Sequence, residues 1–207
     1  MDIAFVLYDK FTALDLVGPY ETLAGNPAVT PHFVAAGRGT VRCESGLPVQ
    51  PTTTFAELDR PDVVVVPGSS AWRTALDDEE LVSWLAAVHP NTTWTTSVCT
   101  GSLLLAKAGI LTGKRATTHW TVREVLGELG AEVVTDRVVF DGKVVTGAGV
   151  SAGIDMGLRL AAELWGEDTA KITQLLLEYD PQPPFDTGSP EKAGPALLAA
   201  ALKALKG

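Results

Sequence analysis

The chain has 207 residues, of which 46% are hydrophobic and 20% are charged. These proportions are typical of a globular protein with one core, and no apolar run approaches the roughly 20 residues that span a membrane. The 16 basic and 25 acidic residues give a net charge of −9, which disfavours binding to nucleic-acid phosphates. We therefore expect a single domain over residues 1–207 that binds neither nucleic acid nor a membrane.

The N-terminus and the cysteine content indicate a cytoplasmic protein. The first five residues lack the basic region and the cleavage site of a secretion signal, and they are typical of a first strand. The two cysteines, Cys43 and Cys99, are too few for a disulfide framework. The three histidines lie far from them and from one another, without the spacing of a zinc site, so we expect no metal.

Apolar runs alternate with helical patterns along most of the chain. Strands buried on both faces are expected at residues 3–8, 32–36, 62–66 and 94–98. Helical periodicity appears at residues 14–24, 79–88, 102–108, 122–129, 152–165 and 168–178. This alternation predicts an α/β fold in which a mostly parallel sheet has helices on both faces. One antiparallel hairpin is expected at residues 138–146, because Asp141-Gly142 between two apolar runs indicates a tight turn.

The C-terminal part of the chain predicts a loop and then a helix. Residues 180–190 contain four prolines, which neither a helix nor a central strand tolerates. This loop is either a plain connector or a cover over a site or a partner subunit, anchored in the second case by Phe185. Residues 193–206 place four leucines on one face of an amphipathic helix, which we expect to pack on the domain or on a partner.

Cys99 lies where a strand pattern meets a helix pattern. Residues 94–98 are β-branched or aromatic with one serine, whereas residues 102–108 are rich in Leu and Ala and end at Gly109. A thiolate at this joint faces unpaired N–H groups and the positive end of the helix dipole, which lowers the thiol pKa. Cys99 is therefore either a catalytic nucleophile or a small buried hydrophobic residue, whereas Cys43, which no helix follows, is taken as structural.

Other candidates follow the first and third predicted strands, since ligands of such sheets bind beyond the carboxyl ends of the strands. Asp15 either caps its own helix by reaching back to Thr12, or carries protons for Cys99 with a raised pKa. Gly68 either forms a simple turn or lets neighbouring N–H groups stabilise negative charge. For His119, packing against the adjacent helix is favoured over a role as a base.

Several motifs resemble those of the isonitrile hydratase family, within the PfpI-like superfamily. The similarity is carried by residues 14–19, 97–103, 108–120, 151–155 and 177–190. The resemblance implies a flavodoxin-like fold, a homodimer without a cofactor, and hydration of isonitriles to N-substituted formamides. It also implies that Cys99 is the nucleophile and Asp15 the general acid and base, and that Gly68, Ser69 and Thr100 line the site.

Two related classes share parts of these motifs. The cysteine turn and the Asp15 segment also resemble regulators in which this domain precedes an AraC-type helix-turn-helix, which we do not expect in this chain. Protease-like relatives place a histidine where Thr100 stands, and Ser69 and Ala148 replace glycines of many relatives, differences that can alter rate or substrate choice. The alternatives to a hydratase are a ligand or redox sensor, and a hydrolase or glyoxalase-like enzyme acting on small carbonyl compounds.

Overall fold

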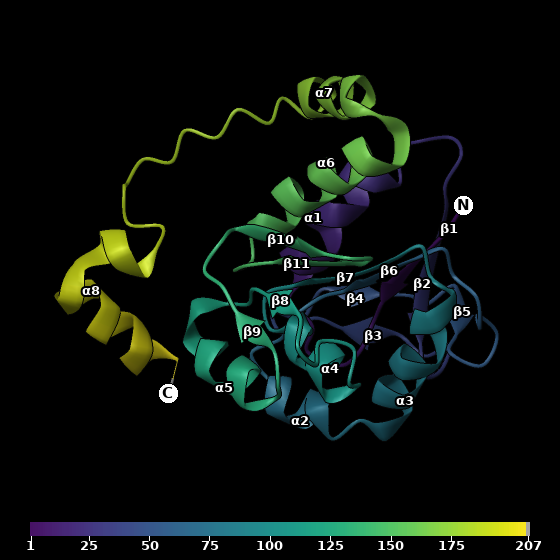
Figure 1. The fold of residues 1–207 in the computed structure, drawn as a ribbon, viewed down its shortest axis with the longest axis horizontal. Helices are drawn as coiled ribbons and strands as arrows, with labels where there is room; N and C mark the ends of the chain where they lie inside the picture. Colours follow the sequence, from purple (N-terminus) through teal and green to yellow (C-terminus); the bar gives the residue numbers. More distant parts are fainter. Residues whose placement is uncertain (206–207) are drawn as a thin grey trace.

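The computed structural model describes residues 1–205, which form a seven-stranded sheet covered by helices on both faces (Figure 1). In spatial order the strands are β10 (Val138–Asp141), β11 (Val144–Gly147), β7 (Trp94–Val98), β6 (Val63–Val66), β1 (Asp2–Val6), β2 (Thr30–Ala35) and β5 (Thr53–Thr54). All neighbours in this sheet are parallel except β10 and β11, which form an antiparallel hairpin. The predicted flavodoxin-like α/β fold and its added hairpin are therefore confirmed.

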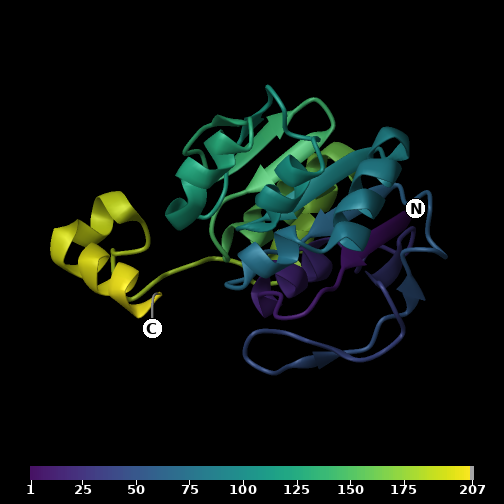
Figure 2. The same cartoon turned by 90° about the horizontal axis from the view of Figure 1, so that it is seen from below.

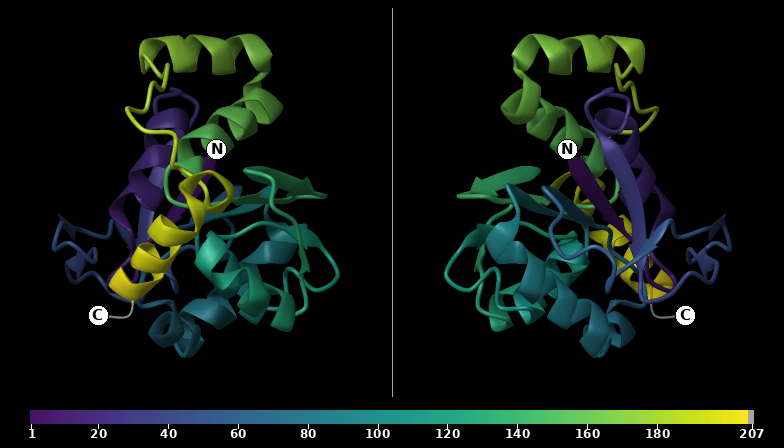
Figure 3. Two further views of the ribbon diagram at one scale, coloured as in Figure 1. Left: turned by 90° about the vertical axis from the view of Figure 1, so that its left-hand side faces the viewer. Right: turned by 90° about the vertical axis from the view of Figure 1, so that its right-hand side faces the viewer.

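The helices lie in layers on the two sides of the sheet (Figures 1 and 3). One side carries α1 (Ala13–Leu23), α6 (Ala152–Trp165) and α7 (Glu167–Leu176). The other side carries α2 (Trp72–Leu76), α3 (Glu79–Val88), α4 (Gly101–Lys107) and α5 (Arg123–Glu128). The 3-10 helices η1 (His89–Asn91) and η2 (Trp120–Val122) precede β7 and α5. No helix within residues 1–205 combines the length and the apolar character that crossing a membrane requires.

The register of the central strands determines where the site forms. All four valines of β6 are fully buried, as expected for a strand covered on both faces. Val65 of β6 pairs with Phe5 of β1 on one side and with Thr96 of β7 on the other. The three strands are parallel and aligned, so their carboxyl ends meet at one edge. The segments that contain Asp15, Gly68 and Cys99 leave the sheet at this edge.

The sequence patterns did not predict the short elements. These are α2, the antiparallel pair β3 (Val41–Arg42) and β4 (Pro48–Val49), the edge strand β5, and the parallel pair β8 (Arg115–Ala116) and β9 (Glu132–Val133). Two-residue strands and a five-residue helix are too short to show a period. Tertiary contacts fix them instead.

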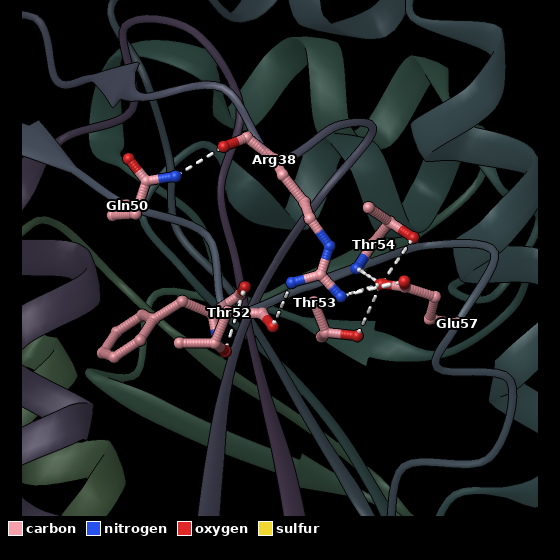
Figure 4. A network of polar contacts seen from close by, with 7 residues as sticks. Arg38, Gln50, Thr52, Thr53, Thr54 and Glu57 are labelled. Carbon is pink, nitrogen blue, oxygen red and sulfur yellow. Dashed lines mark hydrogen bonds and ion pairs between the residues drawn. The ribbon is translucent and has the colours of Figure 1, made fainter.

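A network of polar contacts stabilises the segment between β2 and β6, around Arg38 and Glu57 (Figure 4). One guanidinium nitrogen of Arg38 donates to both carboxylate oxygens of Glu57, at 2.9 and 2.8 Å, and the other donates to the carbonyl of Thr52. Arg38 and the backbone N–H of Thr54 lower the pKa of Glu57 to about 2. These contacts order an exposed loop, whereas the stability gained from an exposed ion pair is small.

The C-terminal arm leaves the domain (Figures 1 and 2). Residues 180–189 contain no helix or strand, as predicted, and Pro190 begins α8 (Pro190–Ala204), a position that proline favours. The predicted helix at residues 193–206 therefore begins earlier than expected, and it is interrupted at Gly194, which has a φ of 73°. Lys206, the last residue of that prediction, lies outside the described residues.

The arm meets its own domain at residues 188–191, which line a cavity together with His119 and Arg123, and where Glu191 lies 3.8 Å from Arg123. Phe185 is 75% exposed and does not anchor the loop on its own domain, whereas its role as an anchor on a partner subunit stays a prediction. No residue of α8 is buried, and its leucines remain exposed or half-buried. The helix was expected to pack either on its own domain or on a partner, and its own domain does not cover it.

Candidate active site

Cys99 occupies a strained turn between β7 and α4. Its φ of 57° lies in the left-handed region, which residues with a side chain rarely adopt. Its N–H faces the carbonyls of Gly147 and Ala148, at 3.1 and 2.8 Å, and its own carbonyl accepts hydrogen bonds from the hydroxyls of Ser102 and Thr118. A strand–turn–helix of this kind presents a nucleophile at the edge of a sheet. The predicted joint between strand and helix is confirmed.

Gly101 allows this turn to pack against the valine strand. A Cβ at this position would collide with the backbone carbonyls of Val66 and Pro67. Gly101 was not among the predicted site residues, although a glycine directly after a strand-to-helix turn indicates close approach of the backbone. The glycine brings the start of α4 against the end of β6.

Asp15 points into the protein rather than toward its own helix start. It is fully buried, and its Oδ2 accepts a hydrogen bond of 2.8 Å from the backbone N–H of Gly68. Thr12 is the N-cap of α1 but makes no side-chain capping bond, and its hydroxyl donates to Glu44 instead. The capping box is therefore not formed. The Gly68 N–H supplies the contact that turns the carboxyl toward the strand–turn–helix at Cys99, called the nucleophile elbow below.

Asp15 and Cys99 are coupled in their titration. Burial raises the pKa of Asp15 to about 7, although the Gly68 N–H and the Cys99 thiol oppose this shift. Burial and the Asp15 carboxylate raise the pKa of Cys99, and the backbone N–H groups of Thr100 and Val150 counteract them only in part. The expected lowering of the thiol pKa is wrong, because burial and a neighbouring carboxylate outweigh the helix start. Near neutral pH the pair therefore loses its first proton from Asp15, and the resulting carboxylate disfavours ionisation of the thiol.

The loop after β6 is locked to the elbow. The Ser69 N–H donates to Oγ1 of Thr100 at 2.8 Å, and the same hydroxyl donates to the Ser69 carbonyl at 2.9 Å. The N–H groups of Gly68 and Ser69 thus both have partners within the protein. The N–H groups that face the sulfur are those of Thr100 and Val150, and Val150 was not among the predicted site residues.

Gly68 is needed for close approach rather than for a simple turn. A Cβ at this position would lie 2.6 Å from the Thr100 nitrogen and 2.8 Å from Oδ2 of Asp15. Real Cβ atoms do not approach other atoms so closely. Glycine is the residue that lets the elbow, the acid and the end of β6 meet.

A cavity of about 740 Å³ lies beside the elbow. Thr118 and Val150, which contact Cys99, form part of its wall, whereas Cys99 itself is only 5% exposed. His119 also lines it and hydrogen-bonds Thr121 at 2.6 Å, and burial lowers the pKa of its imidazole. His119 therefore caps η2 and forms part of the cavity wall.

The groups available for chemistry are few. Within residues 1–205 no group of three or more His, Cys, Asp or Glu side chains is arranged to hold a metal ion. Cys43 and Cys99 are both buried and free. The candidate site consists of one thiol, one carboxyl group and the backbone N–H groups around them.

A cysteine on a strand–turn–helix, beside a buried carboxyl at the carboxyl edge of a parallel sheet, defines a class of flavodoxin-like α/β proteins. The chain belongs to the DJ-1/PfpI family, whose family model matches residues 1–163. It is 46% identical over 203 residues to an isonitrile hydratase from Pseudomonas putida, covering 98% of this chain and 89% of that protein. The resemblance inferred from the motifs is confirmed.

Two further relatives place the chain within the family. A solved ThiJ/PfpI family protein from Pseudomonas syringae is 38% identical and superposes with a TM-score of 0.94, covering 99% of this chain and 85% of that one. The HTH-type transcriptional regulator CdhR from Pseudomonas aeruginosa is 32% identical over 142 residues, covering 67% of this chain but 42% of the regulator. The similarity to the regulator is thus confined to part of that protein.

Proposed function

We propose that this protein is an isonitrile hydratase that converts R–N≡C and water into the formamide R–NH–CHO. One observation carries the proposal: a fully buried carboxyl group, Asp15, has a pKa of about 7 and lies beside the thiol of Cys99 on a nucleophile elbow. The near full-length identity with an isonitrile hydratase supports it.

The first step adds the thiol to the isonitrile. The terminal carbon of an isonitrile must accept a nucleophile and a proton at the same centre, and the site offers one of each. The Cys99 thiol passes its proton to the Asp15 carboxylate and the sulfur bonds to that carbon. Protonated Asp15 then delivers the same proton to the carbon, which gives the thioimidate R–N=CH–S–Cys99. The N–H groups of Thr100 and Val150 stabilise the sulfur while it carries negative charge.

The second step hydrolyses the thioimidate. The Asp15 carboxylate takes a proton from a water molecule, whose oxygen bonds to the thioimidate carbon. Protonated Asp15 passes this proton to the nitrogen. The carbon–sulfur bond then breaks, the proton of the added hydroxyl passes through the Asp15 carboxylate to the sulfur, and the formamide leaves. One water molecule is consumed, and both the thiol and the carboxyl group return to their starting protonation.

The protonation of the pair fits this sequence of steps. General acid–base catalysis is most effective when the pKa of the catalytic group lies near the working pH, and burial brings Asp15 to about 7. Because Gly68 binds Oδ2, the other oxygen, Oδ1, remains without an N–H or O–H partner among the described residues. That oxygen is the one we assign to proton transfer.

The test is formamide production by wild type, Cys99→Ser and Asp15→Asn, with Cys43→Ser as the matched control. Asp15→Asn is expected to lose roughly 10²- to 10⁴-fold in rate, and Cys99→Ser more. Cys43→Ser keeps its activity, since Cys43 touches no reacting group and its sulfur only accepts a hydrogen bond from the Leu47 N–H, which a serine hydroxyl can also accept. Full activity in Cys99→Ser would end the proposal.

A redox sensor is less well supported by the same site. Thiols that act as sensors are exposed and have a low pKa. Cys99 is 5% exposed, and burial raises its pKa. These properties favour a thiol that reacts inside a closed site over one that meets oxidants from solvent.

We also propose that the active form is the homodimer that the resemblance implies. The arm leaves α8 without cover, and large apolar side chains are exposed on α1 and α7, namely Leu14, Val17, Ile172, Leu175 and Leu176. A second copy would bury these surfaces. Light scattering is expected to give a molar mass twice that of one chain. The double variant Leu175→Glu, Leu176→Glu is expected to lower this molar mass, and a monomeric wild type would contradict the proposal.

The cytoplasmic location stays a prediction.

A further inference from the structure

Glu44 bridges the two loops that hold the candidate site, although it lies outside the main sheet. It belongs to the loop between β3 and β4. One carboxylate oxygen accepts a hydrogen bond of 3.2 Å from the Thr12 hydroxyl, and the other accepts one of 3.3 Å from the Ser70 N–H. Thr12 is the N-cap of α1, three residues before Asp15, and Ser70 follows Gly68 and Ser69.

These contacts belong to a set that joins the two loops. The Glu44 N–H donates to the carbonyl of Phe11, and the Thr12 N–H donates to the carbonyl of Gly68 at 2.7 Å. Two more hydrogen bonds join the same loops. The Ser69 hydroxyl donates to the Lys10 carbonyl, and the Tyr8 hydroxyl donates to the Pro67 carbonyl. Glu44, on a third loop, adds a carboxylate that hydrogen-bonds both of these loops.

We propose that Glu44 is a positioning residue for Asp15: its carboxylate holds the start of α1 against the loop after β6 and keeps a fixed negative charge beside the buried acid. The inference rests on the proposed function, since it concerns the proton carrier of the same reaction. Glu44 itself is exposed and touches no reacting atom.

The charges around Asp15 agree with this role. The titratable groups that face Asp15 are Cys99, Tyr8 in the segment after β1, and Glu44 on the β3–β4 loop. After the larger effect of burial, the Glu44 charge is a further cause that raises the pKa of Asp15. It also raises the pKa of Tyr8, again after burial, Asp15 and Cys99. The Glu44 charge therefore moves the loss of the first proton from the Asp15–Cys99 pair to higher pH.

Two variants separate positioning from charge. Glu44→Gln keeps a side chain that can hydrogen-bond both loops but removes the charge. We expect its kcat/KM to rise with pH at a midpoint roughly 0.5 unit below that of wild type, with an unchanged plateau. The difference should shrink in 1 M salt, where the screening length is about 3 Å. Glu44→Ala loses the bridge as well, so its midpoint falls similarly and its plateau kcat drops roughly 10-fold.

The control is Glu163→Gln, which removes an exposed charge from the far end of α6 and should leave the midpoint and the plateau unchanged. The pH dependence of Cys99 alkylation by iodoacetamide, in a Cys43→Ser background, reports the same titration without turnover. Wild-type midpoints in both Glu44→Gln and Glu44→Ala would overturn the inference. Activity retained by Cys99→Ser would instead end the proposed function, and the alkylation midpoints would still decide the role of Glu44.

Discussion

The backbone N–H of Gly68 donates a hydrogen bond of 2.8 Å to Oδ2 of Asp15, whose side chain has no exposed surface. This contact joins residues 53 positions apart and turns the carboxyl away from its own helix start. The partner of Asp15 is thus the end of β6 rather than Thr12. The geometry of the acid depends on one glycine.

Adding a methyl group at position 68 should therefore damage catalysis. In Gly68→Ala the new Cβ would lie 2.6 Å from the Thr100 nitrogen and 2.8 Å from Oδ2 of Asp15, so the elbow and the acid must separate. We expect kcat to fall roughly 10²-fold and the unfolding free energy by about 1 to 3 kcal/mol. Gly25→Ala is the control, because its Cβ meets nothing within 4 Å. Wild-type kcat in Gly68→Ala would contradict the close packing.

The rate should rise with pH through neutrality. The reactive form of the Asp15–Cys99 pair has lost one of its two protons, and burial places the first loss at a pKa of about 7. Below that pH both groups hold their protons and the sulfur is not nucleophilic. We expect kcat/KM to increase from pH 5 to 8 with a midpoint near 7, measured as formamide formation. A profile that declines over this range would exclude the assignment.

The same shift predicts a change in stability. The folded-state pKa of Asp15, about 7, lies above its ordinary value of 3.8, so its contribution is fully present below pH 3.8 and is lost as the pH rises through 7. Between pH 5 and 8 the loss is on the order of 2 to 3 kcal/mol. Asp15→Asn has no titrating group at this position. Its free energy of unfolding in urea, measured relative to that of wild type, should therefore increase from pH 5 to pH 8. Parallel pH dependence of the two proteins would refute the shift.

The features that could be predicted from sequence are those with a local signal. Val63–Val66 indicated a strand buried on both faces, and Asp141-Gly142 indicated the hairpin, because strand burial and turn type depend on a few adjacent residues. Cys99 was found for the same reason, since a strand pattern meets a helix pattern there. Once parallel strands were inferred, the meeting of Asp15, Gly68 and Cys99 at one edge followed.

The features that escaped prediction depend on contacts between distant segments. Thr12 and Asp15 have the spacing of a capping box, but the Gly68 N–H captures the carboxyl instead. The predicted lowering of the Cys99 pKa was wrong, because the burial and the neighbouring carboxylate that raise this pKa arise only when the chain folds. Glu44 reaches Thr12 across 32 residues and Ser70 across 26, so no local pattern marks it.

The proposed mechanism requires a covalent bond between the isonitrile carbon and the sulfur of Cys99. The most direct test is the intact mass of the protein, quenched in acid during turnover and followed by peptide mapping. An added mass equal to one isonitrile is expected on the peptide that contains Cys99, and no added mass is expected in Cys99→Ala. Formamide production by Cys99→Ala, with no adduct on the wild-type protein, would contradict it.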